Sequence, residues 1–208
     1  MTMFQIFQIP VKGFDSNFSY LVRNGNCAAV IDPCGDISKI RTVWDKTLHE
    51  DGEAVPAAVL VTHAHPDHIS GLEEIRTFFS APVYASPFSK LSECRKVTDR
   101  ERIPFGEGFF ECIVTPGHSK DSVCWMTSDR KALFTGDTLF VGCCGFGVPK
   151  ILYSSLNLLK TLDPEIIIYP GHDYGEIPHD TLGHQMAVNP WFAAESLPVF
   201  RERMRELV

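Results

Sequence analysis

Residues 62–68 read Thr-His-Ala-His-Pro-Asp-His and directly follow the apolar run Ala-Ala-Val-Leu-Val at residues 57–61. Three imidazoles so close together repel one another when charged, and each polar group is costly to bury without a partner. A short, continuously apolar run is typical of a strand that is covered on both faces. The stretch therefore predicts a cluster of polar donors at the end of a buried strand.

The same arrangement occurs three more times along the chain. His118 follows Glu-Cys-Ile-Val-Thr-Pro-Gly, Asp137 follows Ala-Leu-Phe-Thr-Gly, and His172 follows Ile-Ile-Ile-Tyr-Pro-Gly. In α/β folds, sites form outside the carboxyl ends of the strands. We therefore expect the four segments to converge and to bring together five histidines and two aspartates: His63, His65, Asp67, His68, His118, Asp137 and His172.

Apolar patterning predicts the elements that carry these residues. Alternating or short apolar runs predict strands at 3–9, 18–23, 27–32, 57–61, 82–86, 109–116, 122–128, 131–137 and 165–173. Asn24-Gly25 lies between the second and third of these and predicts a hairpin. Helical spacing predicts helices at 37–50, 69–80 and 150–162, a C-terminal helix at about 191–207, and some helix within the ambiguous stretch 87–105. We expect one α/β domain over residues 1–208, with sheets packed face to face and helices outside.

Composition excludes several classes of function. The net charge of −7 offers no broad basic surface, which argues against a nucleic-acid partner. We expect no secretory signal, and no apolar run in the sequence approaches the roughly 20 residues that span a bilayer. Its seven cysteines are odd in number and scattered, without a Cys-x-x-Cys pair, so we expect a reducing, cytoplasmic location.

The donor types indicate a metal site. Imidazole and carboxylate suit zinc, iron or manganese, and seven donors exceed the four of a structural zinc site. They suffice for two metals that share one carboxylate and leave positions open for water. Taken singly, His118 or His172 is also compatible with a hydrogen-bonded turn residue, and Asp67 with a helix cap. His49, His179 and His184 fall outside the pattern and are interpreted as surface or supporting residues.

Four motifs together resemble a known family. Thr-His-Ala-His-Pro-Asp-His (62–68), Thr-Pro-Gly-His-Ser (115–119), Gly-Asp-Thr-Leu-Phe (136–140) and Pro-Gly-His-Asp-Tyr-Gly (170–175) occur in this order. They resemble the metal-binding motifs of the metallo-β-lactamase superfamily, and within it those of hydroxyacylglutathione hydrolase (glyoxalase II) and its short bacterial relatives. The resemblance runs from about residue 18 to residue 190. It implies an αββα sandwich with two mixed sheets and the metals at one edge between them.

The resemblance also implies roles for these residues. Two divalent metal ions, zinc or alternatively iron or manganese, would be bound by His63, His65 and His118 and by Asp67, His68 and His172, with Asp137 bridging them. A metal-bridging hydroxide, oriented by Asp67, would attack the carbonyl of a small-molecule thioester such as S-lactoylglutathione. Tyr174 stands where glyoxalase II enzymes place a glutathione-contacting tyrosine, although a core or turn aromatic is an equal alternative.

One loop departs from the family pattern. Residues 141–150 read Val-Gly-Cys-Cys-Gly-Phe-Gly-Val-Pro-Lys, and Phe146 stands where the resemblance implies a basic, substrate-holding residue. We also expect the chain to lack the longer C-terminal helical extension of full-length glyoxalase II, which carries further basic residues. Lys150, Arg201 and Arg203 are candidate substitutes. Cys143 and Cys144 are interpreted as buried structural thiols rather than reactive ones.

Three competing functions remain. The first is a mononuclear iron oxidoreductase that resembles persulfide dioxygenases and uses His63, His118 and Asp137. The second is a phosphodiester or nucleic-acid hydrolase, since related nucleases share the His-x-His-x-Asp-His motif. The third is a non-catalytic metal-binding or scaffold protein, which would not need open metal positions. The oligomeric state is not indicated by the sequence.

Overall fold

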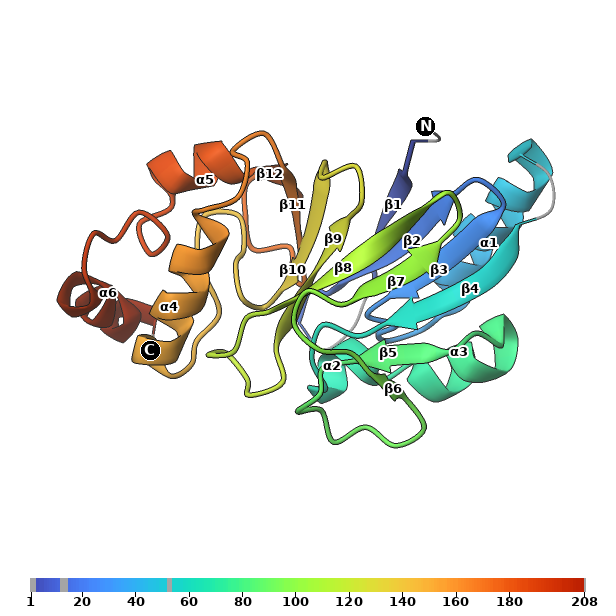
Figure 1. Cartoon of the computed structure of the whole chain (residues 1–208), viewed down its shortest axis with the longest axis horizontal. Coiled ribbons are helices and arrows are strands. Elements are labelled where there is room, and N and C mark those ends of the chain that lie inside the picture. Colours follow the sequence, from blue (N-terminus) through green and yellow to red (C-terminus); the bar gives the residue numbers. More distant parts are fainter. Residues whose placement is uncertain (1–2, 12–14, 52–53, 208) are drawn as a thin grey trace.

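The computed structural model describes residues 3–11, 15–51 and 54–207. Within them, two six-stranded mixed sheets pack face to face, and helices cover both outer faces (Figure 1). This arrangement confirms the predicted αββα sandwich. None of the described helices is both long enough and apolar enough to cross a membrane.

The first sheet follows the chain order β1-β2-β3-β4-β5-β6. Its first three strands pair antiparallel, and the pairs from β3 onward are parallel. The predicted hairpin joins β2 to β3, and Gly25 in its turn has a φ of +58°. The strands are β1 (Gln5–Pro10), β2 (Phe18–Asn24), β3 (Cys27–Ile31), β4 (Val55–Leu60), β5 (Val83–Ala85) and β6 (Arg95–Lys96).

The second sheet has the order β12-β11-β10-β9-β8-β7. Only the described β10–β11 pair is parallel, and the other pairs are antiparallel. Its strands are β7 (Arg102–Phe105), β8 (Gly108–Val114), β9 (Val123–Thr127), β10 (Ala132–Gly136), β11 (Ile167–Pro170) and β12 (Asp180–Thr181).

Alternation along the strands divides the core into three layers. On β2, Phe18, Tyr20 and Val22 face the other sheet and pack with its aromatic residues, whereas Leu21 faces the helices. Between-sheet packing buries Trp125 and Phe134 completely. Because successive side chains of a strand point to opposite faces, one apolar strand supplies both layers.

Two groups of helices complete the sandwich, one on each outer face (Figure 1). Ile40 and Ile75 pack against the first sheet, and Leu156 and Phe200 against the second. The first group is α1 (Ser38–Asp51), α2 (Pro66–Ile69) and α3 (Leu72–Phe79), and the second is α4 (Pro149–Leu159), α5 (Leu182–Val188) and α6 (Leu197–Met204), with a final 3₁₀ turn at Arg205–Leu207.

Two expectations differ from the structure. The stretch 87–105 contains no helix and instead supplies β6 and β7, because buried Ile103 and Phe105 alternate with exposed residues in a two-residue period. The C-terminal helix begins at Leu197 rather than near residue 191. Pro198 then lies in the first turn, where its missing N–H costs no hydrogen bond.

Candidate metal centre

All seven predicted donors meet at one edge between the two sheets. His63 and His65 follow β4, and Asp67 and His68 lie within α2. The other three follow β8, β10 and β11: His118, Asp137 and His172. Donors separated by more than a hundred residues are thus brought together by strand ends, as the sequence predicts.

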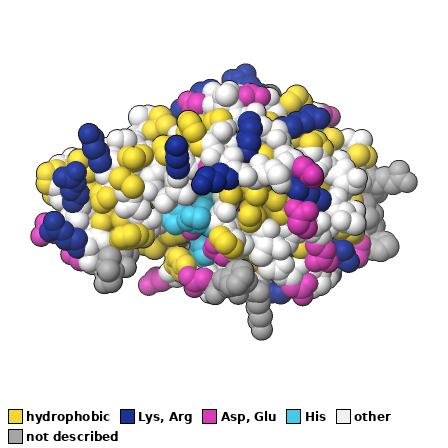
Figure 2. All heavy atoms as spheres, turned by 90° about the horizontal axis from the view of Figure 1, so that it is seen from below, with side chains coloured by type: hydrophobic (Ala, Val, Ile, Leu, Met, Phe, Trp, Pro, Cys, Tyr) yellow, Lys and Arg dark blue, Asp and Glu magenta, His cyan; other side chains and the backbone are white. Residues whose placement is uncertain are grey.

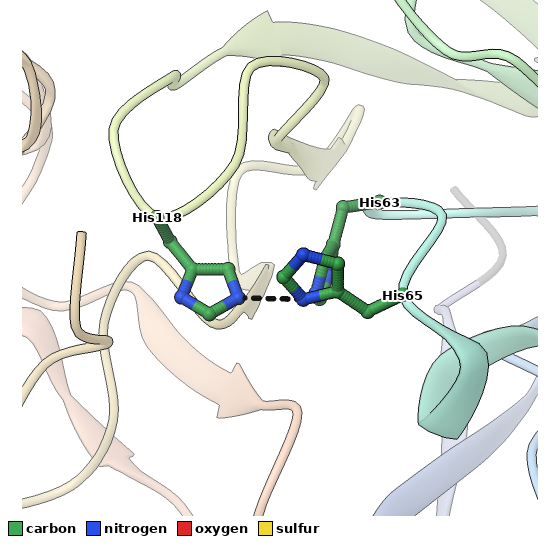
Figure 3. A group of neighbouring side chains, drawn as sticks. All are labelled: His63, His65 and His118. Carbon is green, nitrogen blue, oxygen red and sulfur yellow. Dashed lines mark hydrogen bonds between the residues drawn. The ribbon is translucent and has the colours of Figure 1, made fainter. Parts of the chain in front are cut away.

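His63, His65 and His118 form the first group of donors. Figure 3 shows their rings pointing toward one another from the loops after β4 and β8. His65 Nδ1 lies 3.1 Å from His63 Nε2 and 3.0 Å from His118 Nε2. Nitrogen ligands about 2.0–2.1 Å from a tetrahedral zinc ion lie roughly 3.3 Å from one another, so this spacing suits one ion.

Asp67, His68 and His172 form the second group. His68 Nε2 lies 3.2 Å from His172 Nε2, and Asp67 Oδ2 lies 3.4 Å and 3.3 Å from these two nitrogens. Both imidazoles are buried, whereas the Asp67 carboxylate is partly exposed. Two nitrogens and one carboxylate oxygen again converge within the span of one ion.

Asp137 lies between the two groups. Its Oδ2 is 3.4 Å from Nε2 of both His118 and His172, and its Oδ1 is 3.1 Å from His68 Nε2. Oδ1 is buried without a hydrogen-bond partner in the described structure. Burial alone would raise the pKa of Asp137, but the surrounding imidazoles hold that pKa well below its ordinary value. A buried, unsatisfied carboxylate oxygen at the centre of two donor groups is what a shared metal ligand requires.

Hydrogen bonds to the protein backbone set the tautomers of two donors. His118 Nδ1 donates to the Phe146 carbonyl at 2.8 Å, and His172 Nδ1 donates to the Asp15 carbonyl at 2.6 Å. Because a carbonyl oxygen only accepts, the proton lies on Nδ1 and the Nε2 lone pair faces the centre. Metal-binding histidines are commonly oriented in this way. The donor set therefore fits divalent metal ions.

A family model described as the metallo-beta-lactamase superfamily matches residues 13–172. The chain belongs to this superfamily. This match confirms the family predicted from the four motifs. Together with the clustered donors and a zinc-dependent hydrolase among the relatives, it makes the chain a metal-dependent enzyme.

Three relatives illustrate the range within the superfamily. The probable polyketide biosynthesis zinc-dependent hydrolase PksB of Bacillus subtilis is 30% identical, covering 89% of this chain and 85% of the relative. A hydroxyacylglutathione hydrolase of Francisella philomiragia is 32% identical, covering 92% and 74%. The crystal structure of ETHE1 from Myxococcus xanthus is 27% identical with a TM-score of 0.84, covering 99% of this chain and 91% of that one. These proteins share the fold but carry different names, so the substrate of this superfamily member rests on its own residues.

Two supporting residues were not predicted from the sequence. Asp32, directly after β3, accepts hydrogen bonds from the Thr62 backbone N–H at 2.7 Å and the Thr62 hydroxyl at 2.6 Å, and lies 3.1 Å from His68 Nδ1. It therefore fixes both the start of the donor loop and the His68 ring. The available signal was its position, because Asp32 ends an apolar strand as the metal donors do.

Asn17 supports the second group of donors by contacting Asp67 and His172. Its side chain is buried, and Nδ2 donates to Asp67 Oδ2 at 3.0 Å and lies 3.4 Å from His172 Nε2. The amide therefore orients the Asp67 carboxylate. No periodicity or spacing marks Asn17, since it lies 50 residues from Asp67 in the chain.

Glycine is required beside the centre at two positions. Gly136 has a φ of +48°, and a Cβ there would lie 2.5 Å from the Thr62 hydroxyl oxygen. A Cβ at Gly171 would lie 2.5 Å from Asp137 Oδ1. A side chain at Gly171 would push into the donors Asp137 and His68, and one at Gly136 would push into Thr62 at the start of the donor loop, which explains why a glycine precedes Asp137 and His172.

Burial and neighbouring charges shift the pKa values of the clustered histidines in different directions. Burial lowers the pKa of His63 and His118, so both are neutral donors near pH 7. Burial also acts to lower the pKa of His68 and His172, but Asp137 raises both, helped by Asp32 and Asp67 at His68 and by the Asp15 carbonyl at His172, so that both pKa values lie above the ordinary value. His179 and His184 lie outside the centre, bonded to Gln8 and Asp180, and the side chain of His49 lies outside the described residues.

Two adjoining cavities open beside the centre. The first, about 340 Å³, is lined by His118, Asp137 and Phe146, among others. The second, about 460 Å³, lies beyond it, and Tyr174 and Cys143 line both. Lys150, Arg201 and Arg203, the candidate substitutes for the missing basic residue, line neither cavity.

Phe146, Cys143 and Cys144 of the atypical loop, and Tyr174, differ in their burial and their contacts. Phe146 is exposed, and its contribution to the centre is the backbone carbonyl bonded to His118. Cys144 is buried against Met204, whereas Cys143 is half-buried, and burial raises the pKa of the Cys143 thiol to about 11. Tyr174 stacks on His172 at 4.8 Å, and its hydroxyl donates to the Asp15 carboxylate.

Proposed function

We propose that this chain hydrolyses a small-molecule thioester at a binuclear metal centre, with hydroxyacylglutathione-type esters such as S-lactoylglutathione as the first candidate substrates. The observation that carries the proposal is Asp137, whose two carboxylate oxygens reach both donor groups. A shared carboxylate supports two ions rather than one. The hydroxyacylglutathione hydrolases among its relatives support the substrate class.

Two divalent ions, zinc or alternatively iron or manganese, would supply an activated water and polarise the thioester carbonyl. His63, His65 and His118 would hold one ion, and Asp67, His68 and His172 the other, with Asp137 shared. A zinc-dependent hydrolase among the relatives supports zinc.

The protein's own groups orient and balance this chemistry. Asp137 keeps its negative charge and offsets the positive charge of the ions. Asn17 fixes the Asp67 carboxylate, which is partly exposed and therefore able to orient the attacking water. Tyr174, at the junction of the two cavities, is assigned to contact the substrate.

A panel of acyl thioesters tests the proposal. Protein loaded with two equivalents of zinc is incubated with glutathione and non-glutathione thioesters, and thiol release is followed. Metal analysis of the same sample gives the stoichiometry. We expect hydrolysis that depends on the second equivalent, and a panel left wholly untouched would contradict thioester hydrolysis.

A mononuclear iron oxidoreductase, resembling persulfide dioxygenases, is the second candidate. It is favoured by His63, His118 and Asp137, because Asp137 Oδ2 lies 3.9 Å and 3.4 Å from the Nε2 atoms of the two histidines. Two histidines and one carboxylate are typical of non-haem iron sites. One iron per chain, with oxygen uptake on glutathione persulfide, would favour this function over hydrolysis.

We further propose that the protein works in a reducing, cytoplasmic compartment. All seven cysteines are free in the structure, which supports this location. Fractionation of the source cells, with detection of the protein, tests it.

A further inference from the structure

The larger cavity adjoins the smaller cavity that is lined by the metal donors His118 and Asp137. It has a volume of about 460 Å³, within the range of small-molecule sites. The loop after β10, the turn around Tyr174 and α5 form its walls. Because Cys143 and Tyr174 line it together with the cavity at the metal donors, a bound molecule can extend from one into the other.

We propose that this cavity holds the arm of the thioester that extends from the scissile bond, and that it selects an uncharged, amide-containing arm over the dicarboxylate arm of glutathione. The inference rests on the proposed thioester hydrolysis and narrows its substrate.

The charged side chains of the cavity walls are acidic. Glu176 and Asp180 line the cavity, and no Lys or Arg is among the described residues that line either cavity. The Asp15 carboxylate lies close by, bonded to the Tyr174 hydroxyl. The arm of a glutathione ester carries two carboxylates and one ammonium, so its net charge is negative, and its carboxylates would meet these acidic walls with no Lys or Arg to offset them, which is unfavourable.

Lys and Arg side chains do lie near the histidines on the surface, and Figure 2 shows both signs of charge around them. None of the described Lys or Arg residues lines the cavities. An anionic arm would therefore have to leave the enclosed space to reach them.

Residues of the cavity walls also hydrogen-bond to one another. Asp180 accepts from His184 Nδ1 at 2.6 Å and from Gln185 Nε2 at 2.7 Å. Gln185 Oε1 in turn accepts from the Gly142 backbone N–H at 2.8 Å. These three donors are therefore already engaged within the wall, whereas the Trp191 indole N–H has no partner among the described residues.

The same network suits an amide. The ionised Asp180 carboxylate only accepts hydrogen bonds, so it can also accept an N–H from a bound molecule. Glu176, which has neither a hydrogen bond nor an ion pair among the described residues, is a second acceptor for an N–H. The amide N–H groups of an uncharged arm match these acceptors.

Apolar side chains complete the site. Val141 and Trp191 line the cavity, as do Ile177 and Val188, which are 46% and 52% exposed. Covering this surface with methylene groups would remove apolar area from water. An arm that alternates methylene and amide groups therefore fits the walls better than one that ends in charges.

Two esters of D-lactate that differ only in the thiol test the inference. Zinc-loaded full-length protein is assayed with S-lactoylglutathione and with S-lactoylpantetheine, whose arm is uncharged and carries two amides. We expect kcat/KM to be at least about tenfold higher for the pantetheine ester, because like-charge contacts cost more than the corresponding free energy.

Charge reversal at the wall sharpens the test. Glu176→Lys should shift the ratio of the two kcat/KM values toward glutathione by about tenfold. Glu165→Lys makes the same charge change at an exposed position that lines neither cavity, and should leave the ratio unchanged. If Glu176→Lys fails to fold, Ile177→Lys introduces a positive charge on the same wall.

Each outcome has a distinct meaning. A glutathione ester cleaved as fast as the pantetheine ester, or a ratio that ignores Glu176→Lys, overturns the selectivity and leaves thioester hydrolysis standing. Cleavage of neither ester overturns both the inference and the proposed function. A faster pantetheine ester, with the ratio shifted only by the wall variants, supports both.

Discussion

Asp137 and Glu176 are carboxylates at neighbouring cavities, yet their surroundings differ. Asp137 is buried among four imidazoles, which hold its pKa well below the ordinary value. Glu176 is exposed and pairs with no described residue. Under the proposed function, replacing Asp137 would disrupt both metal positions, whereas replacing Glu176 would leave them in place. We therefore assign the proposed chemistry to the buried carboxylate and the proposed substrate selection to the exposed one.

Removing a donor should have the largest effect. Asp137→Ala should abolish metal occupancy because it removes the carboxylate shared by both groups, and His63→Ala should do so because it removes one ligand of the first group. Either change should lower kcat/KM by about a thousandfold or more. Metal analysis and the thioester assay measure this. His179→Ala, an exposed histidine outside the centre, should change neither quantity. Normal metal content in Asp137→Ala would contradict the shared role.

Metal removal should destabilise the protein as a whole. Each ion at about a thousandfold excess over its dissociation constant contributes about 4 kcal/mol, so chelation of both ions should lower the melting temperature by roughly 16–32 °C. Thermal unfolding with and without chelator measures the shift, and added zinc should reverse it. Glu176→Lys should leave the melting temperature of the zinc-loaded protein unchanged, and a comparable loss there would break the contrast between the two carboxylates.

Asn17→Ala should weaken the second group of donors selectively. Without its N–H the Asp67 carboxylate is no longer oriented, and loss of such a partner commonly costs about 10–100-fold in metal affinity. Titration calorimetry should show a weakened second equivalent of zinc and an unchanged first. Asn26→Ala, in the exposed β2–β3 turn, is the matched control. Equal weakening of both equivalents would assign Asn17 a general structural role instead.

Tyr174→Phe should have the smallest effect. Its hydroxyl already donates to Asp15, so the loss of one further hydrogen bond to the substrate should raise KM for S-lactoylglutathione about 2–10-fold with kcat unchanged. Steady-state kinetics measures this. An unchanged KM would remove the substrate contact and leave Tyr174 as a ring stacked on His172.

The donors were predictable from the sequence, whereas their supports were not. Each donor follows an apolar run and three follow a glycine, so local pattern marks them. Asn17 and the carbonyls of Asp15 and Phe146 act on donors that lie far along the chain, and no local pattern records such a contact. The prediction of some helix within 87–105 is wrong because β6 has only two residues, and the two-residue period of β7 extends over only four.

Patterns along the chain predict the sandwich, the edge at which the site forms and the seven candidate metal donors, because side-chain periodicity and strand-end position are local properties. The folded structure adds that Asp137 lies between two donor groups, and that Glu176 and Asp180 rather than basic residues line the neighbouring cavity. Those facts depend on distances between segments that are remote in the chain, and packing alone sets such distances.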